Sequence, residues 1–208
     1  MVPKVNFKWS FIYQQLIHSS NVKSEEFDIF EYEKYVKDFI LSIEESWRKI
    51  EPSIFRYCEE ISGLKWKKSE IDCYVIKISS YHPFSDPLTI PINLESDGEV
   101  YPLTKERYID FLIHELLHNL FIQNDEETWE YFNHIFNEYS KEEFDTVIHI
   151  PIHMLHKKIF IKFFNENRLI EEIKLSNYYP SYKRSWEIVN EKGEDNLIKE
   201  FKNHLISN

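Results

Sequence analysis

Two histidines and a glutamate interrupt one of the most apolar stretches of the sequence, IDFLIHELLHNLF, which runs from Ile109 to Phe121. Residues four apart lie on the same face of a helix, so His114 and His118 would project together and could bind one metal ion. Glu115 would lie at the edge of that face, where it could act on a water at the ion. Buried polar groups cost free energy without partners, and one cation would satisfy both imidazoles.

The spacing His-Glu-x-x-His places two metal ligands and a general base on one helix in zinc peptidases. A chain of this composition is expected to contain the motif about 0.07 times by chance, even if Asp is allowed in place of Glu. The residues around it are almost all apolar, which predicts a buried helix. The alternative is a pair of hydrogen-bonded core histidines beside a solvated Glu115.

IHELLH resembles the active-site helix of the zincin (HExxH) metallopeptidases. The resemblance implies that His114 and His118 are ligands of one zinc ion (Zn2+) and that Glu115 is the general base. It also implies a small sheet before the motif helix and helices after it. In that layout the stretch DPLTIPI, residues 86–92, corresponds to the edge strand along which an extended peptide substrate binds.

The third ligand distinguishes the branches of this family. A metzincin would have Gly and His where this sequence has Phe121 and Asn124, so that branch does not fit. A gluzincin would have a glutamate about twenty residues downstream on a following helix. Asn137-Glu138 fits that spacing, and Glu130 is a nearer alternative. Both glutamates lie in a charged stretch, where a surface carboxylate is the commoner explanation.

Three further histidines stand among isoleucines in IHIPIHMLHKKIF. His149, His153 and His156 fall on one helical face, and such clustering needs a partner group. His149 or His153 is therefore a predicted zinc ligand, and ligation by both would close the site and make the zinc structural. His156 is expected to act indirectly or at the surface. The choice between these histidines and Glu138 or Glu130 stays open.

Other groups could support such a site. Asp110, Glu126 or Glu127 could accept a hydrogen bond from a ligand imidazole, although a helix-surface charge is commoner. The stretch NYYPSYKRSW contains donors for a developing oxyanion, namely Tyr178, Tyr179, Tyr182 and Arg184. Packing of Tyr182 and Trp186 onto the core is the commoner role for such residues.

The rest of the sequence predicts a small sheet early in the chain and helices later. Residues 1–27 show no clear period and are expected to form a loosely packed N-terminal segment. IDCYVIKI, residues 71–78, alternates as a strand does. DPLTIPINL, residues 86–94, is a second predicted strand, and its two prolines favour a sheet edge. The predicted helices are 29–51, 53–62, 104–124, 126–139, 141–164 and two joined at Gly193.

Composition narrows the class of protein. The formal charge of −11 argues against non-specific binding to nucleic acid and against anionic lipid. No apolar run reaches the length of a bilayer span, and the first twenty residues lack the features of a signal peptide. Cys58 and Cys73 are too few for a disulfide framework and are expected to be small buried hydrophobes. We expect a cytoplasmic protein without a membrane or nucleic-acid partner.

These features together predict an α+β fold, with one mainly helical zincin-like domain over residues 1–208 and a small sheet before the HExxH helix. The expected function is that of a zinc-dependent metallopeptidase, a hydrolase that binds one zinc ion and cleaves a peptide or protein substrate. Two alternatives are a zinc hydrolase of another amide or ester, and a non-catalytic helical module with a structural zinc.

Overall fold

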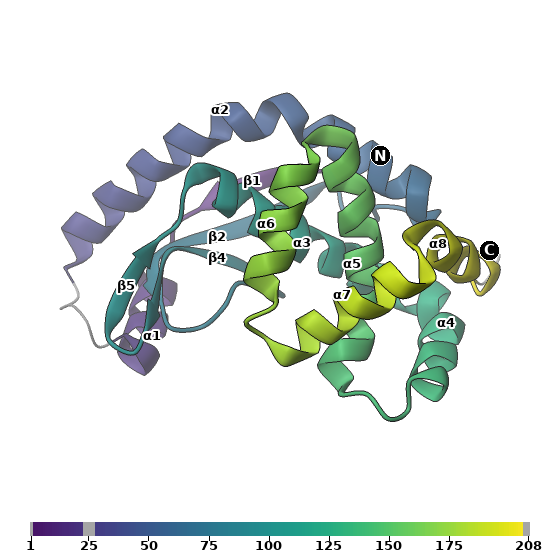
Figure 1. Cartoon of the computed structure of the whole chain (residues 1–208). Helices are drawn as coiled ribbons and strands as arrows, with labels where there is room; N and C mark the ends of the chain where they lie inside the picture. The colour runs from purple at the N-terminus through teal and green to yellow at the C-terminus, as the bar shows by residue number, and fades with distance from the viewer. Residues whose placement is uncertain (1, 23–27, 206–208) are drawn as a thin grey trace. The chain divides into compact units, whose positions relative to one another are not determined.

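The computed structural model describes residues 2–22 and 28–205 (Figure 1). Most of these residues are helical, and five strands form a small mixed sheet, which confirms the predicted α+β, mainly helical fold. The chain divides into two compact units. We call Val2–Pro52 with Lys68–Asn119 the sheet unit, and Ser53–Lys67 with Leu120–Asn208 the helical unit.

The sheet belongs to the sheet unit. Its strands are β1 Lys4–Lys8, β2 Glu70–Ser79, β3 Phe84–Ser85, β4 Leu88–Ser96 and β5 Glu99–Pro102. The spatial order is β1-β2-β4-β3, and β5 also pairs with β4. The pairs β1 with β2 and β2 with β4 are parallel, whereas β3 and β5 are antiparallel to β4. The predicted strand over 71–78 is therefore confirmed as β2.

β4 is not an edge strand, which corrects the prediction made from its prolines. It pairs with β2 on one side and with the short strands β3 and β5 on the other. Pro87 precedes the strand, so only Pro91 lies within it. The missing N–H of Pro91 removes one hydrogen bond, which contributes about 0.5–1.5 kcal/mol to stability. The residues from Leu88 to Asn93 are all buried. Burial of this apolar run therefore outweighs the lost hydrogen bond.

The N-terminal part of the chain forms two elements that its sequence did not predict. β1 pairs with β2, and the Val5 side chain is fully buried. α1 (Phe11–Asn21) begins at Ser10, whose hydroxyl accepts from the Tyr13 amide. The structure thus differs from the expected loose segment over 1–27, of which Met1 and residues 23–27 lie outside the described residues. Pairing with a strand more than sixty residues away leaves no local period to read.

α2 (Ile29–Ser62) is one continuous helix, whereas the sequence predicted a break at Pro52. A proline inside a helix removes one hydrogen bond and costs ~3 kcal/mol. The flanking side chains of Trp47, Ile54 and Phe55 are almost fully buried, and each such burial contributes about 1.5–3 kcal/mol. Packing therefore keeps the helix intact. Its predicted end at Gly63 is confirmed, with a φ of 82° there.

Contacts with α2 hold the first strand of the sheet unit. The carboxylate of Glu51 accepts from the backbone N–H of Val5 at 2.7 Å and from the indole of Trp47 at 2.8 Å. Arg48 pairs with Glu51 at 2.7 Å and donates to the Val5 carbonyl at 2.8 Å. A buried carboxylate is thus fully used as an acceptor that joins α2 to β1.

The motif helix α3 (Lys105–Ile122) follows the sheet in the sequence. The later helices are α4 Asp125–Glu138, α5 Phe144–Phe163, α6 Glu166–Ser176, α7 Pro180–Lys192 and α8 Glu194–Asn203. α5 continues through Pro151, as its apolar spacing predicted, and α7 and α8 meet at Gly193, which has a φ of 80°. α6 was not predicted. Within residues 2–22 and 28–205, no helix is long and apolar enough to cross a membrane.

Candidate metal centre

The motif lies in the middle of α3. The Thr104 hydroxyl accepts from the Arg107 amide at 3.1 Å, so this residue caps the helix where the sequence predicted its start. His114 and Glu115 are buried and His118 is partly buried. The apolar side chains around them are buried as well, at Leu112, Ile113, Leu116, Leu117 and Leu120. The predicted buried helix is therefore confirmed.

The two motif histidines of the sheet unit point at one another. The Nε2 atoms of His114 and His118 are 3.3 Å apart, and the ring centroids are 5.0 Å apart. A tetrahedral zinc ion with bonds of about 2.0–2.1 Å separates its ligand atoms by roughly 3.4 Å. The two Nε2 atoms therefore have the separation that one such ion requires.

Glu115 is a buried carboxylic acid, with 7% of its surface exposed. Within the part of the chain that the structure describes, its carboxyl group makes no hydrogen bond or ion pair. Burial raises the pKa of Glu115 from 4.5 to about 8, because the charged form loses its hydration. A solvated Glu115, which was the alternative interpretation of the sequence, does not match this burial.

Cys73 and Tyr108 are buried groups of the sheet unit that stay neutral. Burial raises the pKa of the Cys73 thiol to about 12, and the Cys73 sulfur lies 3.9 Å from the Tyr108 hydroxyl. Burial also raises the pKa of Tyr108 well above its usual value. Cys58, in the helical unit, is likewise buried with a pKa raised to about 12. Both cysteines are the small buried residues that the sequence predicted, and neither is activated as a nucleophile.

A hydrogen bond that the sequence did not predict joins α3 to β3. Asn119, the residue after His118, is buried and donates from Nδ2 to the carbonyl of Ser85 at 2.8 Å. β3 is the last strand in the sheet order. The bond therefore fixes a sheet edge against the motif helix. The sequence signalled this hydrogen bond only by placing Asn119 in an otherwise apolar stretch. An isolated asparagine does not indicate which residue it binds.

In the helical unit, His149 has the arrangement of a preorganised metal ligand. Its Nδ1–H donates to the carbonyl of Asp145 at 2.6 Å, which leaves the lone pair of the neutral ring on Nε2. Burial lowers the pKa of His149, so the ring is neutral near pH 7. A neutral imidazole whose tautomer is fixed in this way can bind a cation through Nε2.

The other two histidines of α5 are in packing roles. His153 makes a hydrogen bond through Nδ1 to the Ser185 hydroxyl at 3.0 Å, and its ring stacks on Trp186 with centroids 4.3 Å apart. His156 is fully buried and packs edge-on against Phe160 at 4.4 Å. Trp186 is 1% exposed, as its predicted packing role requires.

The candidate oxyanion donors of the stretch NYYPSYKRSW lie in different surroundings. The Tyr182 ring lies over His149 with centroids 4.1 Å apart, so it supports the ring of that histidine. Tyr178 and Tyr179 are exposed on the surface. Arg184 pairs with Glu142 at 2.9 Å and with Glu187 at 3.3 Å, so its charge is already used.

The carboxylates that the sequence offered as zinc ligands or as acceptors for a ligand imidazole are ion-paired, exposed or buried. Glu138 shares its two oxygens between Lys192 and His134. Glu130 and Glu126 are exposed on α4, and Glu127 pairs with Lys67 at 2.9 Å. Asp110 is buried, one turn before His114. Among the candidates in the helical unit, His149 is thus the one whose local geometry suits a metal best.

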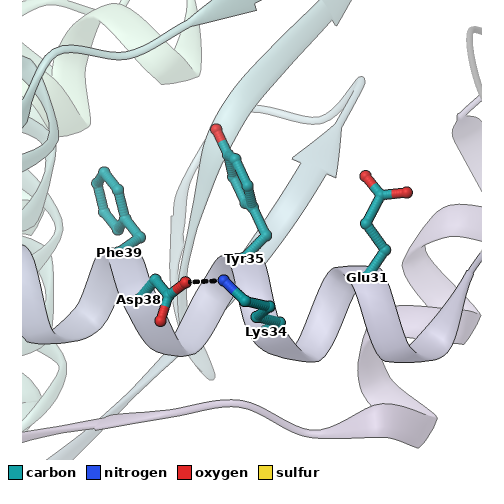
Figure 2. Close-up of a pocket in the computed structure, with 5 residues that line it drawn as sticks. All are labelled: Glu31, Lys34, Tyr35, Asp38 and Phe39. Atoms are coloured by element: carbon teal, nitrogen blue, oxygen red, sulfur yellow. Dashed lines mark hydrogen bonds and ion pairs between the residues drawn. The ribbon is translucent and has the colours of Figure 1, made fainter.

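A separate surface pocket of the sheet unit lies along one face of α2 (Figure 2). Its volume is about 320 Å³, and its lining residues are Glu31, Lys34, Tyr35, Asp38 and Phe39. Lys34 pairs with Asp38 at 2.6 Å, and Glu31 pairs with Lys77 at 3.0 Å. The charges that line this pocket are therefore used within the protein, and the HExxH motif is not part of it.

No protein-family model matches this sequence, and neither the curated proteins nor the solved structures contain a match to it.

Proposed function

We propose that this chain is a zinc-dependent metallopeptidase in which His114 and His118 bind the zinc ion and Glu115 is the general base. The observation that carries the proposal is the burial of Glu115, the residue after His114, on the helix where the imidazoles of His114 and His118 face each other. A buried carboxyl group without a partner costs free energy. A cation and its water would offset that cost, which explains why the sequence keeps all three groups in an apolar helix.

The bound ion would supply Lewis-acid chemistry and lower the pKa of its water to about 7. Glu115 would accept a proton from the attacking water and then pass it to the leaving amine. Burial raises the pKa of Glu115 in the metal-free protein, and a zinc ion nearby would favour the carboxylate form that accepts the proton. Burial would also exclude bulk water from this exchange.

His149 is the third ligand that we propose, since its Nδ1–H is already directed to a carbonyl and its Nε2 carries the lone pair. His153 would then orient α5 through Ser185 and Trp186 and would leave a position open for water. With both histidines as ligands the site would be closed, and the zinc would be structural.

The proposed substrate is an extended peptide bound by strand addition at the edge formed by β3, which Asn119 holds against α3. This replaces the edge that the sequence assigned to DPLTIPI. The net negative charge makes nucleic acid an unsuitable partner, and we propose a cytoplasmic location from the two unpaired, buried thiols.

The test compares three proteins. The unmodified chain is expected to bind zinc and to cleave peptides from an unbiased peptide library in a zinc-dependent way. Glu115→Gln is expected to keep the zinc and lose at least 100-fold in kcat. Glu106→Gln, an exposed carboxylate on the same helix, is the matched control and is expected to keep full activity.

Each other result assigns one of the alternatives. Hydrolysis of amides or esters that are not peptides, with the same dependence on Glu115, would identify another zinc hydrolase. Tight zinc binding by the unmodified chain and by Glu115→Gln, with no hydrolysis of any substrate by either, would identify a structural site. Absence of zinc binding through His114 and His118 would overturn both enzyme proposals.

A further inference from the structure

A second group of potential metal ligands lies in the helical unit, away from the HExxH motif. His134 and Glu138 are four apart on α4, and Glu200 comes from α8. The His134 Nε2 atom is 2.9 Å from Oε1 of Glu200 and 3.4 Å from Oε2 of Glu138. One ligand atom from each of the three residues lies within 4.8 Å of the others.

These separations suit a tetrahedral ion. Bonds of about 2.0–2.2 Å to nitrogen and oxygen place neighbouring ligand atoms roughly 3.4 Å apart. The distance from His134 to Glu138 already has this value, and the distance to Glu200 needs to lengthen by a few tenths of an ångström. Small rotations of a glutamate side chain supply such a change without movement of the helices.

Neighbouring side chains hold the three ligands in place. Lys192 pairs with Oε1 of Glu138, which leaves Oε2 directed at His134. The His204 ring stacks on the His134 ring with centroids 4.3 Å apart and planes 14° apart. His204 also donates from Nδ1 to the Glu200 carbonyl at 2.9 Å. The group is thus preorganised on both helices and is more than a surface ion pair.

Charge and access also favour a cation here. Glu138 and Glu200 carry two negative charges, and Lys192 supplies one positive charge. The side chains of His134, Glu138 and Glu200 are 38%, 33% and 29% exposed, so an ion and its water can reach them. One imidazole with two carboxylates suits zinc, whereas Ca2+ and Mg2+ prefer sites made of oxygen alone.

We propose that His134, Glu138 and Glu200 form a second zinc site, which links α4 to α8 and stabilises the helical unit. The site has three protein ligands, and His204 is a positioning residue that fixes the His134 ring. The proposal does not depend on the proposed peptidase function, because none of its residues belongs to the HExxH motif.

The test uses the full chain with His114→Ala and His118→Ala, so that the motif contributes no zinc binding. Titration of Zn2+ against a chromophoric chelator is expected to find one zinc per chain, and Co2+ is expected to give the visible spectrum of a tetrahedral site. Addition of His134→Ala or Glu200→Gln is expected to weaken zinc binding at least ten-fold. Glu130→Gln, an exposed glutamate on α4, is the matched control and is expected to leave the affinity unchanged.

Stability provides a second readout. Zinc is expected to raise the Tm of the protein with His114→Ala and His118→Ala, and the rise is expected to vanish when His134→Ala is added. Equal zinc affinity with and without His134→Ala would overturn the proposal. If the double substitution at the motif does not fold, the unmodified chain and its His134→Ala variant are compared instead. The His134→Ala variant must then bind one zinc fewer per chain, and equal stoichiometry would overturn the proposal.

Discussion

The Nε2 atoms of His114 and His118 face each other at 3.3 Å on α3, and Glu115, the residue after His114, is buried on the same helix. Two imidazoles in this position can share one proton or one cation. A hydrogen bond between the imidazoles would involve only these two rings and would not engage Glu115. In the proposed site a divalent ion would bind both imidazoles, and its water would hydrogen-bond to Glu115.

We first predict that His118→Ala removes zinc from the motif. Loss of one of the proposed ligand imidazoles is expected to weaken zinc binding by ~100-fold or more. The measurement is a competition titration with a zinc chelator in a chain that also carries Glu200→Gln, so that the proposed second site does not contribute. His82→Ala, an exposed histidine of the sheet unit, is the control. Unchanged zinc affinity in His118→Ala would contradict the metal site.

The second prediction concerns the third ligand. In the same Glu200→Gln background, His149→Ala is expected to weaken zinc binding by ~100-fold or more, and Glu130→Gln to leave it unchanged. His153→Ala is expected to have a smaller effect of about ten-fold, because it loses contacts with Ser185 and Trp186 but no ligand. A larger loss from His153→Ala than from His149→Ala would reverse this assignment.

The third prediction is a pH dependence of stability without metal. Glu115 has a pKa of about 8 in the folded protein, compared with 4.5 as the reference value. The folded state therefore keeps a proton that the unfolded state loses, and the free energy of unfolding falls as the pH rises from about 4.5 to about 8.

Glu115→Gln lacks this titration, so the metal-free variant is expected to be more stable than the unmodified chain by about 2–4 kcal/mol above pH 8 and to match it near pH 4. Urea unfolding with a chelator present, at a series of pH values, measures the difference. A difference that does not change with pH would show that the carboxyl group is not buried as described.

The fourth prediction concerns the buried acceptor between α2 and β1. Glu51→Ala leaves the donors of Val5, Trp47 and Arg48 without their acceptor, and we expect a loss of about 3–5 kcal/mol in the free energy of unfolding. Glu33→Ala removes an exposed pair with Lys37 and should cost less than about 1 kcal/mol. Equal losses from the two substitutions in urea unfolding would rule out this role of Glu51.

The fifth prediction concerns the thiols. Because burial raises the pKa of both Cys58 and Cys73 to about 12, the thiols stay protonated at pH 8 and react slowly with a thiol reagent in the folded protein. Both should react at the rate of a free thiol in urea. Rapid labelling of Cys73 under native conditions would mean that the region beside Glu115 opens readily.

Much of the secondary structure could be predicted from local patterns. The alternation over 71–78 predicted β2, and the apolar spacing predicted that α5 continues past Pro151. Gly63 and Gly193 marked the ends of helices. The errors came from non-local packing. Pro52 does not end α2, because buried side chains on both sides outweigh its missing hydrogen bond, and β4 pairs on both sides despite Pro91.

The pairing of β1 with β2 could not be predicted from local patterns either, because the paired residues are more than sixty positions apart in the sequence. The same holds for Asn119 with Ser85 and for the contact of Glu200 with His134. Two signals for the second cluster were in the sequence, because His134 and Glu138, and Glu200 and His204, are each four apart. Neither pair alone distinguishes a metal site from a solvated helix face.

The sequence by itself determined the pair His114 and His118 with Glu115, because helical spacing alone puts two imidazoles on one face. It also determined that this helix is buried, through its apolar neighbours. Only the tertiary structure decided that the Glu115 carboxyl group makes no hydrogen bond or ion pair within residues 2–22 and 28–205, that Asn119 holds β3, and that His149 directs its Nδ1–H to a carbonyl. The reason is physical: burial, tautomer and pKa depend on neighbours that folding brings from distant parts of the chain.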